Sequence, residues 1–531
     1  MPRHLELPPQ PNLFVSTSNF NNQVRNIRYN AFDPYAYTQG RWLDKDRERR
    51  EARQLDFNFE ALVDIAINSS DGAHRLVARL PNHLAGPPRL TVSSETATLQ
   101  YVREKTTVPV PKVLAWSVDS KTNSVGAEYM VMEAANGVPL SSVWNQMTGS
   151  QHIACIESIG KLAKQLCSLE FADFGSLYFD GPDRPAGAIS HDERYCIGPH
   201  CARQHWGYGH KKDARSTMLE GCQGSWRDIA AYSSDLAQLA RSTIQARGST
   251  ESDNNHLQLL DIYQSTVEAI RSLESFRNIS KPLLFHPDLH IRNIFVHESD
   301  HTMVTSIIDW QAAAIEPSFV NTAETPDIAQ LLTLDKTLDA TLDAETKNAR
   351  TDAERCATTW IVMRHLCPKL GEAALVLDPL ARDVIVDSDF ENSDERKSSA
   401  AALCRFLTAA SSGWLDDPVC IRSVLADLGG QWHDLGLPGT SLYQPTQADT
   451  EALSVQLDEF ESTQRLREYL SRLLGCDHDG WVSAERWDEV LPVYREQYEK
   501  FVESCVASKE QHETEAAALE KAQRLWPFDM R

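Results

Sequence analysis

The stretch 283–296, LLFHPDLHIRNIFV, places two histidines, an aspartate, an arginine and an asparagine between two apolar runs. Asp288 and Asn293 lie five residues apart, and the extended runs that follow, IFV and VTSIID, predict a hairpin that returns Asp309 toward Asn293. An aspartate can orient an attacking hydroxyl group and accept its proton, while an amide oxygen and a second carboxylate suit Mg²⁺. Phosphoryl transfer from a nucleotide requires these groups, so the spacing indicates a phosphotransferase site.

The pattern H-x-D-L-x-x-x-N, followed by a hairpin and I-D-W, resembles the signature of the aminoglycoside phosphotransferase and choline kinase family, small-molecule kinases with a protein-kinase-like fold. The resemblance implies that Asp288 is the catalytic aspartate and that His286 organises its loop. It also implies that Asn293 and Asp309 bind Mg²⁺ on the phosphates of ATP. The alternative for all four residues is a polar turn with structural caps.

The residues around this motif refine the prediction. His290 and Arg292 fall at variable positions of the motif, and we interpret them as polar groups of the loop. A protein kinase carries D-F-G where this chain has Asp309-Trp310-Gln311, and A-P-E further on, and neither D-F-G nor A-P-E is present. We therefore expect a small-molecule hydroxyl acceptor rather than a protein substrate.

The segments VARLP, SSETATLQYVR, VPVPKVLAWS, GAEYMVMEAANGVPL, YCIGP and WPFD resemble the fungal subgroup named altered inheritance of mitochondria protein nine, over nearly the whole chain. This resemblance implies that Glu95 pairs with the basic residue of the preceding strand, which is Arg79 here and lysine in the general kinase pattern. It further implies that the backbones of Glu133 and Ala135 contact the adenine of ATP. Arginine is longer and planar, so it does not replace lysine equivalently. The alternative is that Arg79 is a surface base on an edge strand.

The predicted elements form an α+β chain, and the resemblance implies a two-lobed protein-kinase-like fold in which a reduced N-lobe precedes a large, mainly helical C-lobe. Apolar periodicity predicts a helix from Phe57 and another over 93–105 that starts at Ser93 or Ser94 and carries Glu95 on its buried stripe. The chain divides into an N-terminal arm over 1–50, an N-lobe over 51–135 and a C-lobe over 136–531 with its catalytic loop at 285–311. The other predicted segments are a strand over 74–80, an antiparallel pair over 108–118 and 127–135, a solvated repeat over 333–345 and a long amphipathic helix over 487–523.

A kinase covers the nucleotide phosphates with a glycine-rich hairpin, but this chain has no glycine between Gly40 and Gly72. Two strands and their loop are therefore expected to be absent from the N-lobe. Three interpretations stay open. The chain is a hydroxyl kinase whose gene sequence lacks a segment, a pseudokinase that binds nucleotide weakly or not at all, or a structural factor associated with mitochondria.

The composition of the chain limits the kinds of partner that we expect it to bind. There are 75 acidic and 52 basic residues, a net charge of -23, which disfavours a phosphate-backbone grip on nucleic acid. No apolar run approaches the roughly 18 residues of a membrane span. The first 32 residues hold three arginines and one acid without a long apolar run, so we expect a mitochondrial presequence, with a polar terminus of a cytoplasmic protein as the alternative.

The cysteines and histidines suggest one alternative kind of site, a metal-binding site. Eleven cysteines occur without a CxxC pair, which favours a reducing compartment over a disulfide framework. The segment 191–210 could supply ligands to a soft metal, but its spacing matches no standard zinc pattern. We predict instead that this segment is a loop on the acceptor side of the cleft. The candidate ligands would be His191, Cys196, His200, Cys201, His205 and His210.

Overall fold

The structure is a computed structural model. It describes residues 13–16, 40–70, 75–206, 222–247, 251–320, 328, 402–403, 405–407, 418–477, 479–507 and 514–528. The repeat at 333–345 and His210 lie outside these residues.

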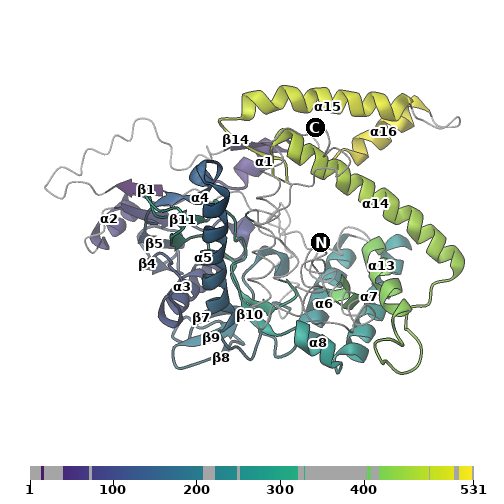
Figure 1. The fold of residues 1–531 in the computed structure, drawn as a ribbon, viewed down its shortest axis with the longest axis horizontal. Helices are drawn as coiled ribbons and strands as arrows, with labels where there is room; N and C mark the ends of the chain where they lie inside the picture. Colours follow the sequence, from purple (N-terminus) through teal and green to yellow (C-terminus); the bar gives the residue numbers. More distant parts are fainter. Residues whose placement is uncertain are drawn as a thin grey trace.

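An antiparallel four-stranded sheet forms the N-lobe, at the left of Figure 1, in the order β1-β3-β5-β4. Its strands are β1 (Leu13–Ser16), β3 (Arg75–Arg79), β4 (Val113–Ser117) and β5 (Tyr129–Glu133). The predicted strand before Leu80 and the predicted antiparallel pair are confirmed. β1 adds a neighbour to β3 that the sequence did not indicate.

Two helices cover the two faces of this sheet, α2 (Phe59–Asn68) and α3 (Pro88–Lys105). Leu76 and Ala78 of β3 belong to the apolar cluster with α2, whereas Val77 packs on the cluster that includes α3. Side chains alternate along a strand, so Arg79 points to the same face as Val77. The strand period therefore presents Arg79 to α3.

The start of α3 differs from the prediction. The helix begins at Pro88, because proline has a preset φ and lacks only an N–H that the first helical turn would leave unpaired. Ser93 and Ser94, predicted as N-caps, are buried inside the helix. The predicted buried position of Glu95 is confirmed, since only 5% of it is exposed.

The side chain of Asn58 caps α2 by accepting a hydrogen bond of 3.1 Å from the N–H of Ala61. We expect Asn58→Ala to lower the free energy of unfolding by about 1 kcal/mol, because the first turn loses this acceptor. Thermal or urea unfolding measures the change. Gln54→Ala, an exposed substitution just before the helix, is the control and should change stability by less than about 0.5 kcal/mol. Equal effects of the two substitutions would contradict the capping role.

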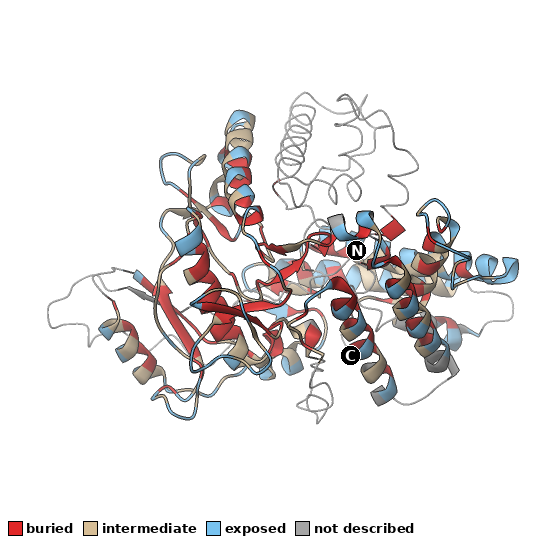
Figure 2. Ribbon diagram, turned by 90° about the horizontal axis from the view of Figure 1, so that it is seen from below, coloured by how far each residue is buried: buried red, intermediate tan, exposed pale blue. Residues whose placement is uncertain are grey.

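The C-lobe begins with a core that it shares with α3 and β5, and buried residues line this shared core in Figure 2. The catalytic segment lies within this core, between a two-stranded sheet and a three-stranded one. A further small sheet packs against α3, as shared apolar contacts indicate. The elements are β6 (Val138–Pro139), α4 (Leu140–Val143), α5 (Gly149–Cys167), β7 (Ser176–Phe179), β8 (Ile189–Ser190), β9 (Tyr195–Gly198), β10 (Pro282–Leu284), β11 (Ile294–Val296), β12 (Val304–Ile307) and β13 (Ile315–Pro317).

A second core is helical and lies at the lower right of Figure 1. Its largest buried side chains include Tyr232, Tyr263 and Phe406, and Tyr263 stacks on Phe406. Among the described residues, no helix combines the length and apolarity needed to cross a membrane. The helices of this core are α6 (Ile229–Arg247), α7 (Glu251–Ile270), α8 (Glu274–Ile279) and α13 (Pro418–Gly430).

Residues from near both ends of the chain form a third core, at the top of Figure 1. Trp42 is 1% exposed, and its indole N–H donates to Asp479 at 2.8 Å. Residues 40–50, which we predicted as part of the N-terminal arm, fold against the C-terminal segment. The helix predicted over 487–523 is divided in two. The elements are β2 (Gly40–Trp42), α1 (Asp46–Glu51), α14 (Gln447–Leu474), β14 (Trp481–Ser483), α15 (Trp487–Ala507) and α16 (Glu515–Leu525).

Candidate active site

His286 ties the two ends of the catalytic segment together. Its Nδ1 accepts the N–H of Asp288 at 3.1 Å, so the ring proton is on Nε2, which donates to the carbonyl of Ile308 at 2.8 Å. Burial lowers the pKa of His286, which favours this neutral form. The ring also packs edge-on against Trp310. His286 thus holds both Asp288 and Ile308, the residue before Asp309. These two contacts are consistent with the loop-organising role that the resemblance implies.

Asp288 is a carboxylate held by three donors. Oδ2 accepts from Arg292 and from the side-chain amide of Asn293, both at 2.8 Å, and Oδ1 lies 3.1 Å from Nε2 of His290. Burial acts to raise the pKa of Asp288, but Arg292 and His290 outweigh burial and lower it below its usual value. Asp288 is therefore ionised, and its carboxylate is engaged by all three donors. His290 and Arg292 are its direct partners, which we predicted only as polar groups of the loop. The i, i+4 spacing of Asp288 and Arg292 was the sequence feature that could have indicated their ion pair.

The predicted hairpin brings Asn293 beside Asp309. β11 and β12 pair with Ile294 opposite Ile307, and the N–H of Ile308 donates to the carbonyl of Asn293 at 2.9 Å. The side-chain nitrogen of Asn293 faces Asp288, so the amide oxygen is the atom that Asn293 can offer to a cation. Asp309 has a φ of 67°, in the left-handed region that aspartate tolerates better than most residues. The antiparallel register thus provides the two oxygen donors that the motif implies.

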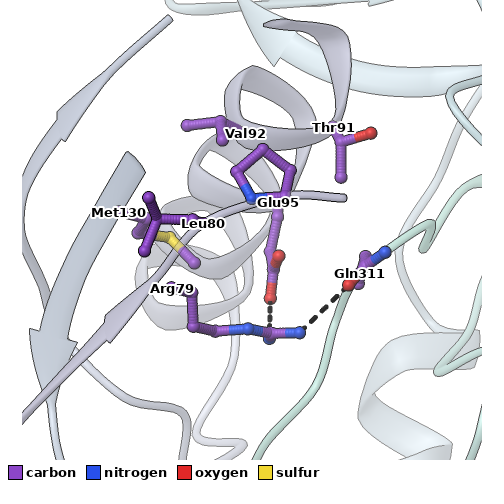
Figure 3. A pocket seen from close by; sticks show the side chains of 8 residues that line it. Arg79, Leu80, Thr91, Val92, Glu95, Met130 and Gln311 are labelled. Atoms are coloured by element: carbon purple, nitrogen blue, oxygen red, sulfur yellow. Dashed lines mark hydrogen bonds and ion pairs between the residues drawn. The ribbon is translucent and has the colours of Figure 1, made fainter. Parts of the chain in front are cut away.

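Arg79 connects the N-lobe to this hairpin. One guanidinium nitrogen contacts Glu95 at 2.5 Å, and another contacts Asp309 at 2.7 Å and Gln311 at 3.1 Å. Figure 3 shows the Arg79 side chain reaching from its strand below α3 toward Gln311. Arg79 is 9% exposed, so the alternative of a surface base is wrong. Gln311 is a participant that we did not predict, although it directly follows the I-D-W motif.

The pKa of Glu95 is raised from 4.5 to about 7, because burial outweighs the attraction of Arg79 and Asp309 adds repulsion. The pKa of Arg79 is raised, because Glu95 and Asp309 together outweigh the burial that lowers it. The cation is thus permanent, and the two carboxylates compete for it. Arg79 holds Asp309, which is also the predicted metal ligand.

A pH dependence of stability follows from Glu95. Its carboxyl group binds a proton more tightly in the folded protein than in the unfolded chain, so its contribution to the free energy of unfolding falls as pH rises from about 4.5 to 7. We expect the difference in unfolding free energy between the wild type and Glu95→Gln to decrease across this window in chemical denaturation series.

Glu104 on the same helix supplies a control of opposite sign. Burial raises its pKa, but Gln100, Tyr195 and Arg194 lower it overall, so its contribution is present at neutral pH and is lost on acidification. Glu104→Gln should therefore show the reverse trend. A flat difference for Glu95→Gln would contradict a raised pKa at that position.

The segment 134–137, which we call the hinge, connects β5 to β6, and β6 pairs with β11 of the catalytic hairpin. The N–H of Glu133 donates to the carbonyl of Lys112 at 2.9 Å, so an adenine would have to use the carbonyl of Glu133 and the N–H of Ala135. Gly137 has a φ of 89°, and a Cβ there would overlap the carbonyl oxygen of Val296. Only glycine allows the hinge to approach the catalytic hairpin this closely.

The position beside β3 is occupied by β1, which pairs with it from Leu13 opposite Ala78 to Ser16 opposite Arg75. β1 has the sequence LFVS and contains no glycine. Among the described residues no glycine-rich hairpin lies next to β3. We predicted that both strands before β3 are absent, whereas the described residues include one of them, β1.

Within the segment at 191–210, the structure describes residues 191–206. Tyr195 to Gly198 form β9, and Tyr195 and Cys196 are buried. His200 and His205 are buried too, with ring centroids 4.1 Å apart. Cys196 and Cys201 lie outside the group of side chains that could hold a metal, which joins the two histidines to Glu316 instead.

The loop, the hairpin and the buried Arg79–Glu95 pair lie together in a kinase-like α+β fold. A sequence model of the family described as phosphotransferase enzyme family (APH) matches residues 65–356, more than half of the chain. The chain belongs to this phosphotransferase family.

Curated fungal relatives match part of the chain. A subtelomeric hrmA-associated cluster protein of Aspergillus fumigatus is 28% identical over 292 residues, covering 48% of this chain and 56% of that protein. Altered inheritance of mitochondria protein 9, mitochondrial, of Clavispora lusitaniae is 24% identical over 386 residues, covering 56% of this chain and 62% of that protein. The chain thus spans little more than half the length of the curated relatives it matches.

Solved structures in the comparison are aminoglycoside phosphotransferases. APH(2'')-Ib with ADP bound is 12% identical with a TM-score of 0.30, and the match covers 63% of this chain and 87% of that one. APH(3'')-Id from Streptomyces rimosus, in complex with ADP and streptomycin, is 14% identical with a TM-score of 0.25, over 57% and 88% of the two chains.

Proposed function

We propose that the chain is an ATP- and Mg²⁺-dependent phosphotransferase that acts on a hydroxyl group of a small molecule. The observation that carries this proposal is the register of β11 and β12, which sets Asn293 beside Asp309 next to the ionised Asp288. A carboxylate with a lowered pKa is a weak base, so Asp288 would chiefly orient the attacking hydroxyl group and take its proton as the new bond forms.

The other residues would bind the nucleotide. Asn293, through its amide oxygen, and Asp309 are hard oxygen donors and would hold Mg²⁺, which neutralises charge on the phosphates. Arg79, held by Glu95, would direct its guanidinium at phosphate oxygens once Asp309 releases it. The backbones of Glu133 and Ala135 would contact adenine. We propose a mitochondrial location, which the names of the Candida and Clavispora relatives support.

A second candidate is a pseudokinase that binds nucleotide without transferring phosphate. Two observations favour it. No glycine-rich hairpin adjoins β3 in the described part of the chain, and Asp309 is already paired with Arg79 at 2.7 Å. Backbone donors over the phosphates keep the transferred group in line, so their loss reduces rate more than it reduces binding.

Two measurements on the full chain separate these candidates. Mg-ATP at about 100 times its dissociation constant should stabilise a nucleotide-binding protein by about 2.7 kcal/mol. Transfer of labelled γ-phosphate to a pool of hydroxyl compounds, including amino sugars, then identifies an enzyme. Binding without transfer supports the pseudokinase, and the absence of both would overturn nucleotide-dependent function.

A further inference from the structure

The strongest cluster of metal-binding side chains lies outside the candidate active site. One ligand atom from each of His200, His205 and Glu316 lies within 4.8 Å of the other two. All three residues are buried, and they come from the segment after β9 and from β13. We propose that these three side chains form a site for Zn²⁺ that links the segment 199–206 to the strand pair leading into the catalytic loop.

His205 supplies the independent observation. It is completely buried, and neither ring nitrogen has a hydrogen-bond partner among the described residues. A buried polar group without a partner destabilises the folded state, because it has lost its hydrogen bonds to water. Burial lowers the pKa of His205 well below its usual value, with His200 acting in the same direction. The ring is therefore neutral, which is the form that coordinates a metal.

The neighbouring side chains hold the cluster in place. Nδ1 of His200 accepts the N–H of Ala202 at 3.1 Å, and Nε2 donates to Oε1 of Glu316 at 3.0 Å. Zn²⁺ would replace the proton that Nε2 now shares with Glu316, and that proton would leave to solvent. The rings of Trp226 and Tyr232 enclose His205, with centroids 5.5 and 6.4 Å away.

The donor set selects the ion. Two imidazoles and one carboxylate suit zinc, whereas Mg²⁺ prefers oxygen ligands. Ligands about 2.0–2.2 Å from a tetrahedral zinc ion lie roughly 3.3–3.6 Å apart. The cluster's wider separations, of up to 4.8 Å, would therefore shorten, and the 3.0 Å separation of His200 and Glu316 would lengthen slightly. Three ligands leave one position for water. The zinc site can be tested independently of the proposed phosphotransferase function, because Zn²⁺ uptake requires no nucleotide.

The location indicates a structural role. Glu316 stands opposite Leu283 in the pairing of β13 with β10, and β10 runs directly into His286. An ion bound here would fix the strand that precedes Asp288. Its removal should loosen the loop without removing any residue that contacts substrate.

The test uses the full chain after chelation. The protein is titrated with Zn²⁺, with Mg²⁺ as the contrasting ion, against a competing zinc dye and by thermal unfolding. We expect one zinc per chain and a rise in Tm with Zn²⁺ only. His205→Phe retains an aromatic ring and removes the unpaired nitrogens, so its metal-free Tm should equal or exceed that of the wild type while zinc affinity falls by more than about 100-fold.

Two further variants keep the test decisive. Glu316→Gln preserves shape and should also weaken zinc binding by at least about 10-fold, even where His205→Phe packs badly. His297→Phe, on the exposed hairpin turn, should leave zinc binding unchanged and controls for the loss of one histidine elsewhere in the chain. No zinc uptake by the wild type, or wild-type affinity in both cluster variants, overturns the proposal.

Discussion

Asp288→Asn is expected to lower phosphate transfer from Mg-ATP by about 10²–10⁴-fold, with little effect on nucleotide affinity. The substitution preserves size, but it removes the charge that Arg292 and His290 hold beside the site. An amide cannot accept the proton of an attacking hydroxyl group, so the loss falls on turnover. Steady-state measurement of ADP formation gives the rate, and calorimetric titration gives the affinity.

Asp300→Asn is the matched control. Asp300 lies in the turn between β11 and β12, where its carboxylate accepts only local hydrogen bonds from Thr302. It undergoes the same chemical change in the same hairpin and should retain wild-type turnover. An Asp288→Asn variant as fast as this control would remove Asp288 from the mechanism. A wild type without turnover, but with normal affinity, would favour the pseudokinase.

Asp309→Ala is expected to abolish the tightening of ATP binding by Mg²⁺, a loss on the order of 10-fold or more. Asp309 is the carboxylate donor of the predicted metal pair, and it also holds Arg79 at 2.7 Å. Its removal frees the guanidinium for phosphate, so binding of ATP without metal should persist or increase. The dissociation constant of ATP, measured with Mg²⁺ and with a chelator, reports both effects.

Gln311→Ala provides the comparison, because it removes a 3.1 Å oxygen partner of Arg79 and leaves the Asp309 carboxylate in place. The Mg²⁺ dependence should survive this change. If Asp309→Ala retained the wild-type response to Mg²⁺, Asp309 would serve only as the ion-pair partner of Arg79. Loss of ATP binding in both the presence and absence of Mg²⁺ would indicate that the Arg79–Asp309 contact holds the lobes together.

The contact between Arg79 and Asp309 gives the site two alternative charge pairings. In the structure the guanidinium pairs with both Asp309 and Glu95. If Asp309 binds Mg²⁺ as proposed, Arg79 would retain Glu95 and gain phosphate oxygens as partners. Arginine suits this exchange, since its planar fork can bond carboxylate and phosphate in turn. The exchange gives a reason for arginine where kinases of this kind carry lysine.

The candidate site was predictable where its contacts are local. His286, Asp288 and Asn293 lie within eight residues, and the hairpin that carries Asp309 follows at once, so turn and strand patterns suffice to place them. The buried position of Glu95 follows from helical periodicity. The start of α3 could not be predicted in this way, because Pro88 and the buried surroundings of Ser93 override the preference of serine for caps.

The sequence by itself indicated the family and the likeness to a kinase, and it predicted the residues of the candidate loop, because short-range spacing carries the chemistry of that loop. Only the tertiary structure decided that Arg79 pairs with Asp309, 230 residues away, and that Trp42 packs beside Asp479. It alone brought His205 to Glu316. These contacts depend on how separate elements pack, and packing joins residues whose spacing along the chain carries no periodic signal.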